Sequence, residues 1–169
     1  VYVDDDAEEG AWRPGAASRW WLHHSLAALN ADLQARGSRL ILRRGPALAT
    51  LRALCAESGA AGVVWNRRYE PAVVQRDQRV KSALQTDGVQ VASHNGALLA
   101  EPWEVSNRDG GPFRVFTPFW RQLMNSLRPA APLPAPARIP APPAWPRSAA
   151  LADLGFLPDV ERILANTPE

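Results

Sequence analysis

The chain has 169 residues, of which 46% are hydrophobic and 21% are charged, a composition typical of one globular domain with its own core. Its net charge of +2 does not indicate direct DNA binding, and its one cysteine excludes an intramolecular disulfide and a cysteine-rich metal site. The sequence lacks the roughly 18 consecutive apolar residues of a membrane span. It opens with VYVDDDAEEG, which is acidic where a signal peptide is basic, so we expect a cytoplasmic protein.

Short apolar runs alternate with helical patterns over the first 95 residues. Leu22, Leu26, Leu29 and Leu33 recur at helical spacing, and Gly37 is expected to end that helix in the left-handed conformation. Strands are predicted at residues 1–3, 40–42, 63–65 and 89–91, and helices at 16–35, from 48 to near 59, and from 71 to near 88. This alternation predicts an α/β fold, an open parallel sheet with helices on both faces.

The alternation stops after Asn95. Residues 97–116 are expected to form a long connection, and Thr117 and Pro118 to begin a short helix, with Thr117 as the N-cap. Residues 129–147 contain eight prolines and therefore predict a semi-extended linker. We accordingly expect an α/β domain over residues 1–128, followed by a proline-rich linker and a short terminal segment over 129–169.

Polar residues follow each predicted strand. In open parallel sheets the ligand lies beyond the carboxyl ends of the strands, where this sequence places residues 4–6, 43–44, 66–70 and 93–95. Their arginines, asparagine, tyrosine and carboxylate suit a planar, polar or anionic ligand. The sequence has neither a G-x-G-x-x-G nor a P-loop motif, and His23 and His24 point about 100° apart on a helix, so a metal site is not expected. The residues alone thus indicate an α/β domain with a small-molecule site.

Several segments in register point to a family. The first domain of the photolyase/cryptochrome family resembles N-R-R-Y-E-P at 66–71, R-D-x-x-V-K at 76–81, N-G-A-L-L at 95–99, E-P-W-E-V at 101–105 and V-F-T-P-F-W at 115–120. S-R-W-W-L at 18–22 and R-R-G at 43–45 fit the same family, and residues 151–158 resemble its interdomain connection. The resemblance therefore runs through nearly the whole chain.

The resemblance implies a flavin-dependent, light-driven enzyme that splits pyrimidine dimers, or a related blue-light sensor. In that family the FAD, the electron-transfer tryptophans and the DNA-binding surface belong to a C-terminal helical domain that lies beyond this chain. The chain should therefore hold no catalytic residue and be inactive on its own, with DNA an indirect partner only. The family's N-terminal domain resembles a Rossmann sheet, and in many members it holds an antenna chromophore that passes excitation to FAD.

We accordingly expect the antenna domain of a deoxyribodipyrimidine photolyase. The alternatives are a cryptochrome-like blue-light sensor domain, or an interaction or structural fragment with an empty site. The expected polar contacts to a planar chromophore are Arg19, Arg44, Asn66, Arg67, Tyr69 and Glu70. Two of them have structural alternatives, because Glu70 is also placed to cap the third helix and Arg67 to form an ion pair across the domain interface.

Two departures from the family pattern qualify this reading. Folate-binding members carry an asparagine and a glutamate where this chain has Ala72 and Val73, so a flavin, a deazaflavin or no antenna is favoured over folate. The family's first strand is absent, which suggests either a fragment or direct pairing of Val1–Val3 with Val63–Trp65. Residues 115–120 are expected to pack against the helical domain or the core. Without the helical domain, these residues and Trp103 should leave an exposed apolar patch, which would be a liability or a dimer interface.

Overall fold

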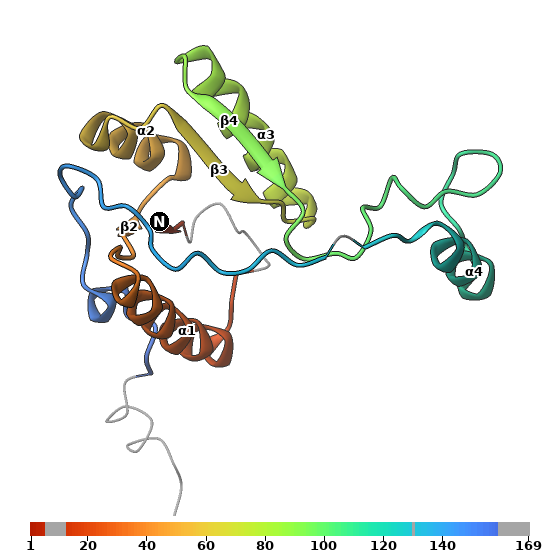
Figure 1. Ribbon diagram of the computed structural model, residues 1–169, viewed down its shortest axis with the longest axis horizontal. Coiled ribbons are helices and arrows are strands. Elements are labelled where there is room, and N and C mark those ends of the chain that lie inside the picture. The colour runs from red at the N-terminus through yellow and green to blue at the C-terminus, as the bar shows by residue number, and fades with distance from the viewer. Residues whose placement is uncertain (6–12, 130, 159–169) are drawn as a thin grey trace, which may run out of the picture. The chain divides into compact units, whose positions relative to one another are not determined.

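The computed structural model describes residues 1–5, 13–129 and 131–158. Two predicted features lie outside the described residues: Asp6, expected just beyond the carboxyl end of the first strand, and residues 159–169 of the terminal segment. Strands and helices alternate along the chain (Figure 1). The elements are β1 (Tyr2–Asp4), α1 (Ala16–Ala35), β2 (Leu42–Arg44), α2 (Ala47–Ser58), β3 (Gly62–Asn66), α3 (Pro71–Thr86), β4 (Gln90–His94), α4 (Phe116–Ser126) and the 3-10 turn η2 (Leu151–Leu154).

The strands form two parallel pairs. β1 pairs with β2, with Tyr2 opposite Leu42 and Asp4 opposite Arg44. β3 pairs with β4, where the Gln90 N–H donates to the Ala61 carbonyl at 2.9 Å and the Arg67 N–H to the His94 carbonyl at 2.8 Å. Partner positions rise together along both strands, as parallel pairing requires. No ladder joins β1 to β3 in the described residues, so the hypothesis that these strands pair directly is wrong.

Glycines end the helices where the sequence predicts. Gly59, with φ of 67°, is the left-handed C-cap of α2, and Gly37, with φ of 83°, follows the last turn of α1. The start of α4 differs from the prediction, since its N-cap is Val115 and Thr117 lies inside the first turn, so the Thr117 N-cap prediction is wrong. Pro118 still fits there, because the first-turn N–H groups of a helix need no carbonyl partner within the helix.

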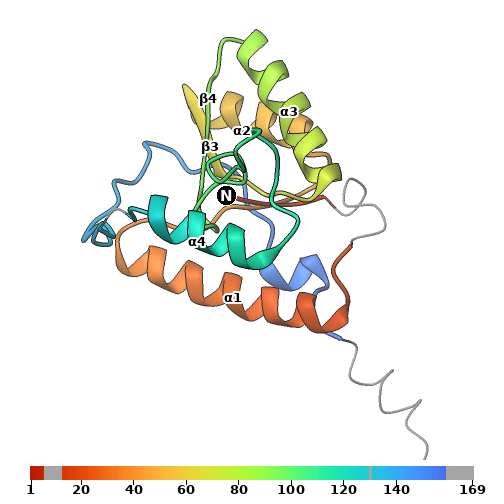
Figure 2. The ribbon, with the colours of Figure 1, turned by 90° about the vertical axis from the view of Figure 1, so that its right-hand side faces the viewer.

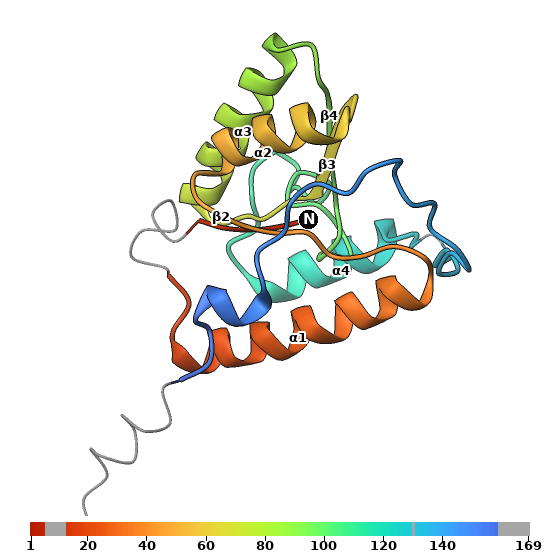
Figure 3. The same ribbon diagram turned by 90° about the vertical axis from the view of Figure 1, so that its left-hand side faces the viewer.

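Chain contacts divide the molecule into two units, which we call unit 1 (residues 1–63, 69–91 and 136–169) and unit 2 (residues 64–68 and 92–135). Unit 1 has a leucine-rich core to which α1, β2 and the end of the chain contribute. Its buried members are Leu26, Leu40, Leu42, Leu154 and Phe156. Within it η2 packs against α1, and the two lie side by side in Figures 2 and 3.

Residues 136–158, which we call the strap, are bonded to unit 1 along their length. The Ile139 N–H donates to the Arg36 carbonyl at 2.8 Å, and the Ala149 N–H donates to the Leu42 carbonyl at 2.9 Å. The Arg36 guanidinium in turn donates to the Pro136 carbonyl at 3.2 Å. Residues 136–147 of the strap form neither helix nor strand. The strap is nevertheless part of the unit 1 fold, because Leu154 and Phe156 fill the core.

Unit 2 contains α4 and the long connection that precedes it. Phe116, Trp120 and Met124 follow one another at intervals of four residues, so they share one face of α4. They are 69%, 47% and 51% exposed, and Trp103 in the same unit is exposed as well. The predicted exposure of large apolar side chains around residues 115–120 and Trp103 is therefore present.

Candidate functional site

Arg44 closes the carboxyl end of the β1–β2 pair. Its Nε donates to Asp4 Oδ2 at 3.0 Å, across the register pair that joins the two residues. A terminal nitrogen of the same guanidinium donates to the Leu154 carbonyl of the strap. The neighbouring Asp5 accepts the Ala47 N–H at 2.7 Å, which places a carboxylate at the positive start of α2. This strand end is thus held together by its own charged groups.

Arg19 lies on the first turn of α1 and lines a pocket of about 260 Å³. The other walls of this pocket are Pro14, Ala16 and residues 155–158 of the strap. The pocket brings Arg19 next to the end of the strap, within unit 1.

In unit 2, Arg67 is held by three kinds of contact. Its Nε and one terminal nitrogen donate to Glu101 Oε1, its other terminal nitrogen donates to the Ser93 carbonyl at 2.8 Å, and its guanidinium lies 5.6 Å from the Trp103 ring centroid. Glu101 is buried, and a buried carboxylate is stable only when it is paired and hydrogen-bonded. The sequence did not indicate that Glu101 is the ion-pair partner of Arg67.

Asn66 sits directly against Gly96. A Cβ built on Gly96 would lie 2.4 Å from Asn66 Cγ, so a larger residue fits there only if the Asn66 side chain moves. The same loop is shaped by Asn95, whose Oδ1 accepts the Ala97 and Leu98 N–H groups at 3.1 and 2.9 Å. The N-G-A-L-L segment therefore owes its conformation to a side-chain turn and a close approach to the end of β3.

Tyr69 and Glu70 precede α3 in unit 1. Glu70 Oε2 accepts the Tyr69 N–H at 3.1 Å. Glu70 occupies the N-cap position of α3, yet its side chain makes no capping hydrogen bond. The six predicted contacts are thus divided: Arg19, Arg44, Tyr69 and Glu70 belong to unit 1, and Asn66 and Arg67 to unit 2.

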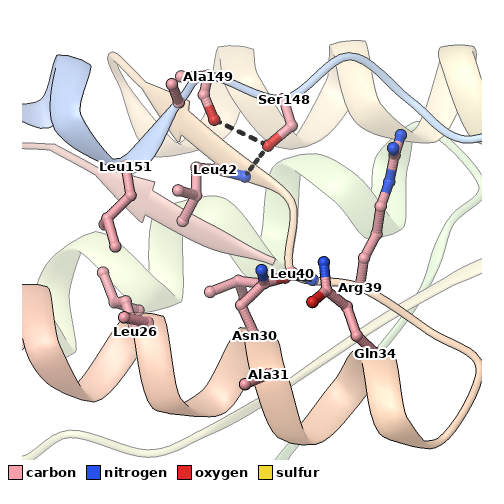
Figure 4. A pocket seen from close by; sticks show the side chains of 12 residues that line it. Leu26, Asn30, Ala31, Gln34, Arg39, Leu40, Leu42, Ser148, Ala149 and Leu151 are labelled. Atoms are coloured by element: carbon pink, nitrogen blue, oxygen red, sulfur yellow. Dashed lines mark hydrogen bonds between the residues drawn. The ribbon is translucent and has the colours of Figure 1, made fainter.

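Unit 1 also contains a larger pocket, of about 430 Å³, that was not predicted from the sequence. Its walls come from α1, from β2 with the residues before it, and from the strap (Figure 4). Asn30 and Gln34 lie four residues apart and so share one face of α1. This spacing is the one feature of the sequence that could have pointed to the α1 wall of the pocket. The strap residues Ser148 and Leu151 could not be assigned to this pocket from sequence, because they lie more than 100 positions beyond α1.

Comparison with known proteins identifies the family. A family model described as DNA photolyase matches residues 1–138. The chain belongs to the DNA photolyase family. The deoxyribodipyrimidine photo-lyase of Agrobacterium fabrum is 47% identical over 158 residues, which cover 94% of this chain and 32% of the relative. Cryptochrome-1 of Arabidopsis thaliana is 40% identical over 141 residues, which cover 82% of this chain and 21% of the relative.

Solved photolyases have the same fold. A class III photolyase from Agrobacterium tumefaciens superposes with a TM-score of 0.86 at 45% identity, covering 94% of this chain and 32% of that one. An archaeal photolyase from Sulfolobus tokodaii, described with two FAD molecules and a novel light-harvesting cofactor, reaches 0.70 at 19% identity, covering 92% and 34%. The latter likeness concerns the fold alone. The fold is accordingly α/β and Rossmann-like, and the chain spans between about a fifth and a third of the length of its curated relatives.

No helix among the residues that the structure describes combines the length and the hydropathy needed to cross a membrane. Within the same residues, histidine, cysteine and carboxylate side chains do not gather in groups of three or more that could hold a metal ion.

Proposed function

We propose that this chain is the light-harvesting domain of a deoxyribodipyrimidine photolyase. In this proposal it binds a planar antenna chromophore and passes excitation to FAD in a C-terminal helical domain, where light-driven repair of pyrimidine dimers takes place. The observation that carries the proposal is the 47% identity to the Agrobacterium fabrum photolyase over 94% of the chain. The chain alone is then inactive in repair.

A flavin or a deazaflavin remains the favoured chromophore at the strand ends. Folate-binding members have hydrogen-bonding side chains at the two positions that Ala72 and Val73 occupy here. These two side chains cannot hydrogen-bond a folate, and Val73 is buried in α3. The predicted contacts to the chromophore remain those named from the sequence, with Arg19 on α1 and the others at or just after the strands: Arg44, Asn66, Arg67, Tyr69 and Glu70. The antenna role itself does not depend on which part of the domain holds the chromophore.

We further propose that the helical domain covers the apolar face of α4. This helix has 11 residues and none of them is buried, whereas isolated helices shorter than about 12 residues are marginal in water. A partner that covers Phe116, Trp120 and Met124 would remove exposed apolar surface, at roughly 25 cal/mol per Å². A second copy of the chain would cover the same face in a homodimer.

The antenna role is tested by reconstitution. The chain is mixed with a separately produced, FAD-loaded helical domain of the Agrobacterium fabrum relative, with and without FMN or a deazaflavin, and repair of a pyrimidine-dimer oligonucleotide is followed as a function of wavelength. We expect repair only when the helical domain is present, with an added band in the action spectrum where the chromophore absorbs. A chromophore that binds without adding such a band would contradict energy transfer.

The same mixture tests the proposed interface. Replacing Phe116 and Trp120 by serine should weaken association of the two parts, whereas Leu133→Ser, which changes a still more exposed apolar side chain outside α4, should not. If the chain alone sediments as a dimer that the Phe116 and Trp120 changes dissociate, the face joins two copies instead.

A cryptochrome-type sensor is the second candidate, favoured by the 40% identity to Cryptochrome-1 of Arabidopsis thaliana. The helical domain of the Agrobacterium fabrum photolyase cannot separate the two candidates, because it brings its own repair chemistry; this chain's own helical domain is needed for the comparison. An assembly with that domain that reduces its flavin in blue light but leaves the dimer lesion intact would support the sensor over the repair enzyme.

A further inference from the structure

The pocket of about 430 Å³ in unit 1 lies where three parts of the chain meet. One wall comes from α1, the second from β2 and the residues before it, and the third from the strap (Figure 4). The largest apolar side chains that line it are Leu26, Leu40, Leu42 and Leu151. Its volume falls within the range of about 300–1,000 Å³ that small-molecule pockets occupy. A compound that fills it must therefore bring an apolar body to these leucines.

The polar side chains of α1 that line this pocket offer hydrogen-bond donors. Asn30 Oδ1 accepts the Leu40 N–H at 2.9 Å, whereas neither Asn30 Nδ2 nor the Gln34 side-chain amide has a partner among the described residues. Ser148 differs, because its hydroxyl oxygen accepts the Leu42 N–H at 2.9 Å and its hydrogen is used within the strap. Two amide groups on one face of α1 are therefore available to the oxygen atoms of a ligand.

Arg39 is the one charged side chain among the twelve described residues that line the pocket. Its guanidinium lies 4.8 Å from the Trp145 ring centroid and donates one hydrogen bond to the Pro146 carbonyl at 3.2 Å. An arginine has five N–H donors, and in the part of the chain that the structure describes this guanidinium has no carboxylate partner. The lining thus carries a positive charge that the protein does not neutralise. A carboxylate is the anion whose two oxygens match the fork of a guanidinium.

We propose that this pocket binds a small monocarboxylate with an apolar body, the class to which short fatty acids and simple aromatic acids belong. The apolar body lies on the leucines, and the carboxylate is bound by Arg39 with the side-chain amides of Asn30 and Gln34. The inference goes beyond the proposed antenna function and does not depend on it, because neither α4 nor any of the predicted chromophore contacts lines this pocket.

Occupancy of the pocket should be coupled to docking of the strap. Residues 148–151 of the strap belong to the pocket lining, so a compound bound there contacts the strap and the rest of unit 1 at the same time. A ligand that binds only the docked form stabilises that form by mass action. The strap should therefore be held more firmly against unit 1 when the acid is bound.

The test uses the whole chain in equilibrium dialysis with radiolabelled octanoate and benzoate, and with their neutral analogues octanamide and benzamide. The wild type should bind at least one acid, and bind it more tightly than its amide. Arg39→Gln should weaken binding of that acid about tenfold, the usual effect of losing one charge-assisted hydrogen bond, and leave the affinity for the amide unchanged.

Two tryptophan substitutions on α1 locate the binding. Ala31→Trp places an indole from an exposed position of α1 into the pocket and should abolish binding of the acid and of the amide. Ala28→Trp is the matched control, because it makes the same change on the same helix at an exposed position that does not line the pocket. It should leave both affinities unchanged.

Limited proteolysis measures the coupling to the strap. Trypsin cleaves after arginine, and the bond between Arg147 and Ser148 lies at the pocket wall, whereas the bond between Arg114 and Val115 lies in unit 2. The bound acid should slow cleavage after Arg147 and leave cleavage after Arg114 unchanged. At ten times its Kd it should also raise the melting temperature by about 3–6 °C.

Thermal unfolding of each variant without ligand verifies that it folds, and Arg39→Gln keeps the test decisive if Ala31→Trp does not fold. Equal affinity for acid and amide, or binding that survives both Arg39→Gln and Ala31→Trp, overturns the proposal, since the compound then binds elsewhere or through its apolar part alone. A wild-type chain that binds neither acid overturns it as well. None of these results affects the antenna function, which the wavelength dependence of repair tests separately.

Discussion

Arg67 donates two hydrogen bonds to a single oxygen of Glu101, from Nε at 3.0 Å and from a terminal nitrogen at 2.5 Å. The two residues lie 34 positions apart, on either side of β4. The ion pair therefore ties the end of β3 to the connection that follows β4, within unit 2. Glu101 is the more buried partner. Removing Arg67 should therefore lower the free energy of unfolding more than neutralising Glu101 does.

Arg67→Ala is expected to lower the free energy of unfolding by about 2–3 kcal/mol, because it leaves a buried carboxylate without its cation. Glu101→Gln keeps an acceptor for the guanidinium and should cost less. Denaturant titration monitored by tryptophan fluorescence measures both. Arg52→Ala, which removes an arginine from an exposed pair with Asp87, is the control and should change the unfolding midpoint little. Equal costs for Arg67→Ala and Glu101→Gln would contradict the asymmetry.

Gly96→Ala should lower the free energy of unfolding by about 1–3 kcal/mol, since the new Cβ overlaps the Asn66 side chain and one of them must move. Asn66→Ala removes the overlapping atoms, so the double variant should recover most of the loss. A double-mutant cycle by chemical denaturation measures this coupling. Additive effects of the two changes would show that the contact is absent in solution.

The strap should be energetically part of unit 1. Leu154→Ala and Phe156→Ala each create a cavity in the core, because these side chains are only 3% and 5% exposed, and each should cost about 2–5 kcal/mol. Leu157→Ala changes a neighbouring residue that is about half exposed and should cost under about 0.5 kcal/mol. Thermal unfolding followed by circular dichroism distinguishes the three. If all three behave alike, the strap does not dock in solution.

The exposed pair of Arg52 and Asp87 should give a small, pH-dependent contribution to stability. Two hydrogen bonds from Arg52, at 2.6 and 3.0 Å, hold the pKa of the Asp87 carboxyl below its usual range. A lowered folded-state pKa stabilises the fold above the unfolded-state pKa, and the contribution is lost as the pH falls through the folded-state value. The difference in melting temperature between wild type and Asp87→Asn should thus be present at neutral pH and shrink below about pH 4. A difference that grows in acid would contradict this sign.

Local features of the fold could be predicted, because they depend on nearby residues. Gly37 and Gly59 end their helices as glycine chemistry requires. The strand predicted at residues 40–42 lies at 42–44 instead, although Leu40 and Ile41 are buried. The apolar run reveals which residues are buried, whereas the hydrogen-bonded stretch is set by the register with β1, which begins at the Tyr2–Leu42 pair.

Long-range contacts could not be predicted from the sequence. The proline content of residues 129–147 disfavours helix and strand but does not reveal that the Ser148 hydroxyl accepts the Leu42 N–H or that the Arg39 guanidinium lies over the Trp145 ring. These partners are more than 100 residues apart and belong to no common motif. The 430 Å³ pocket was missed for the same reason, since the strap forms one of its walls.

The position of Leu154 and Phe156 in the chain bears on how the protein is made. A ribosome adds about 5–20 residues each second, and it completes α1, β2 and all of unit 2 before it reaches these two side chains. Until then the core leucines of α1 and β2 lack the side chains of Leu154 and Phe156 that pack against them. Completing the core brings together residues over 100 positions apart, as in the Arg44–Leu154 hydrogen bond. Such distant contacts slow folding. Unit 1 should therefore finish folding only after the ribosome has passed Phe156, and chaperones that hold apolar segments have the preceding interval in which to act.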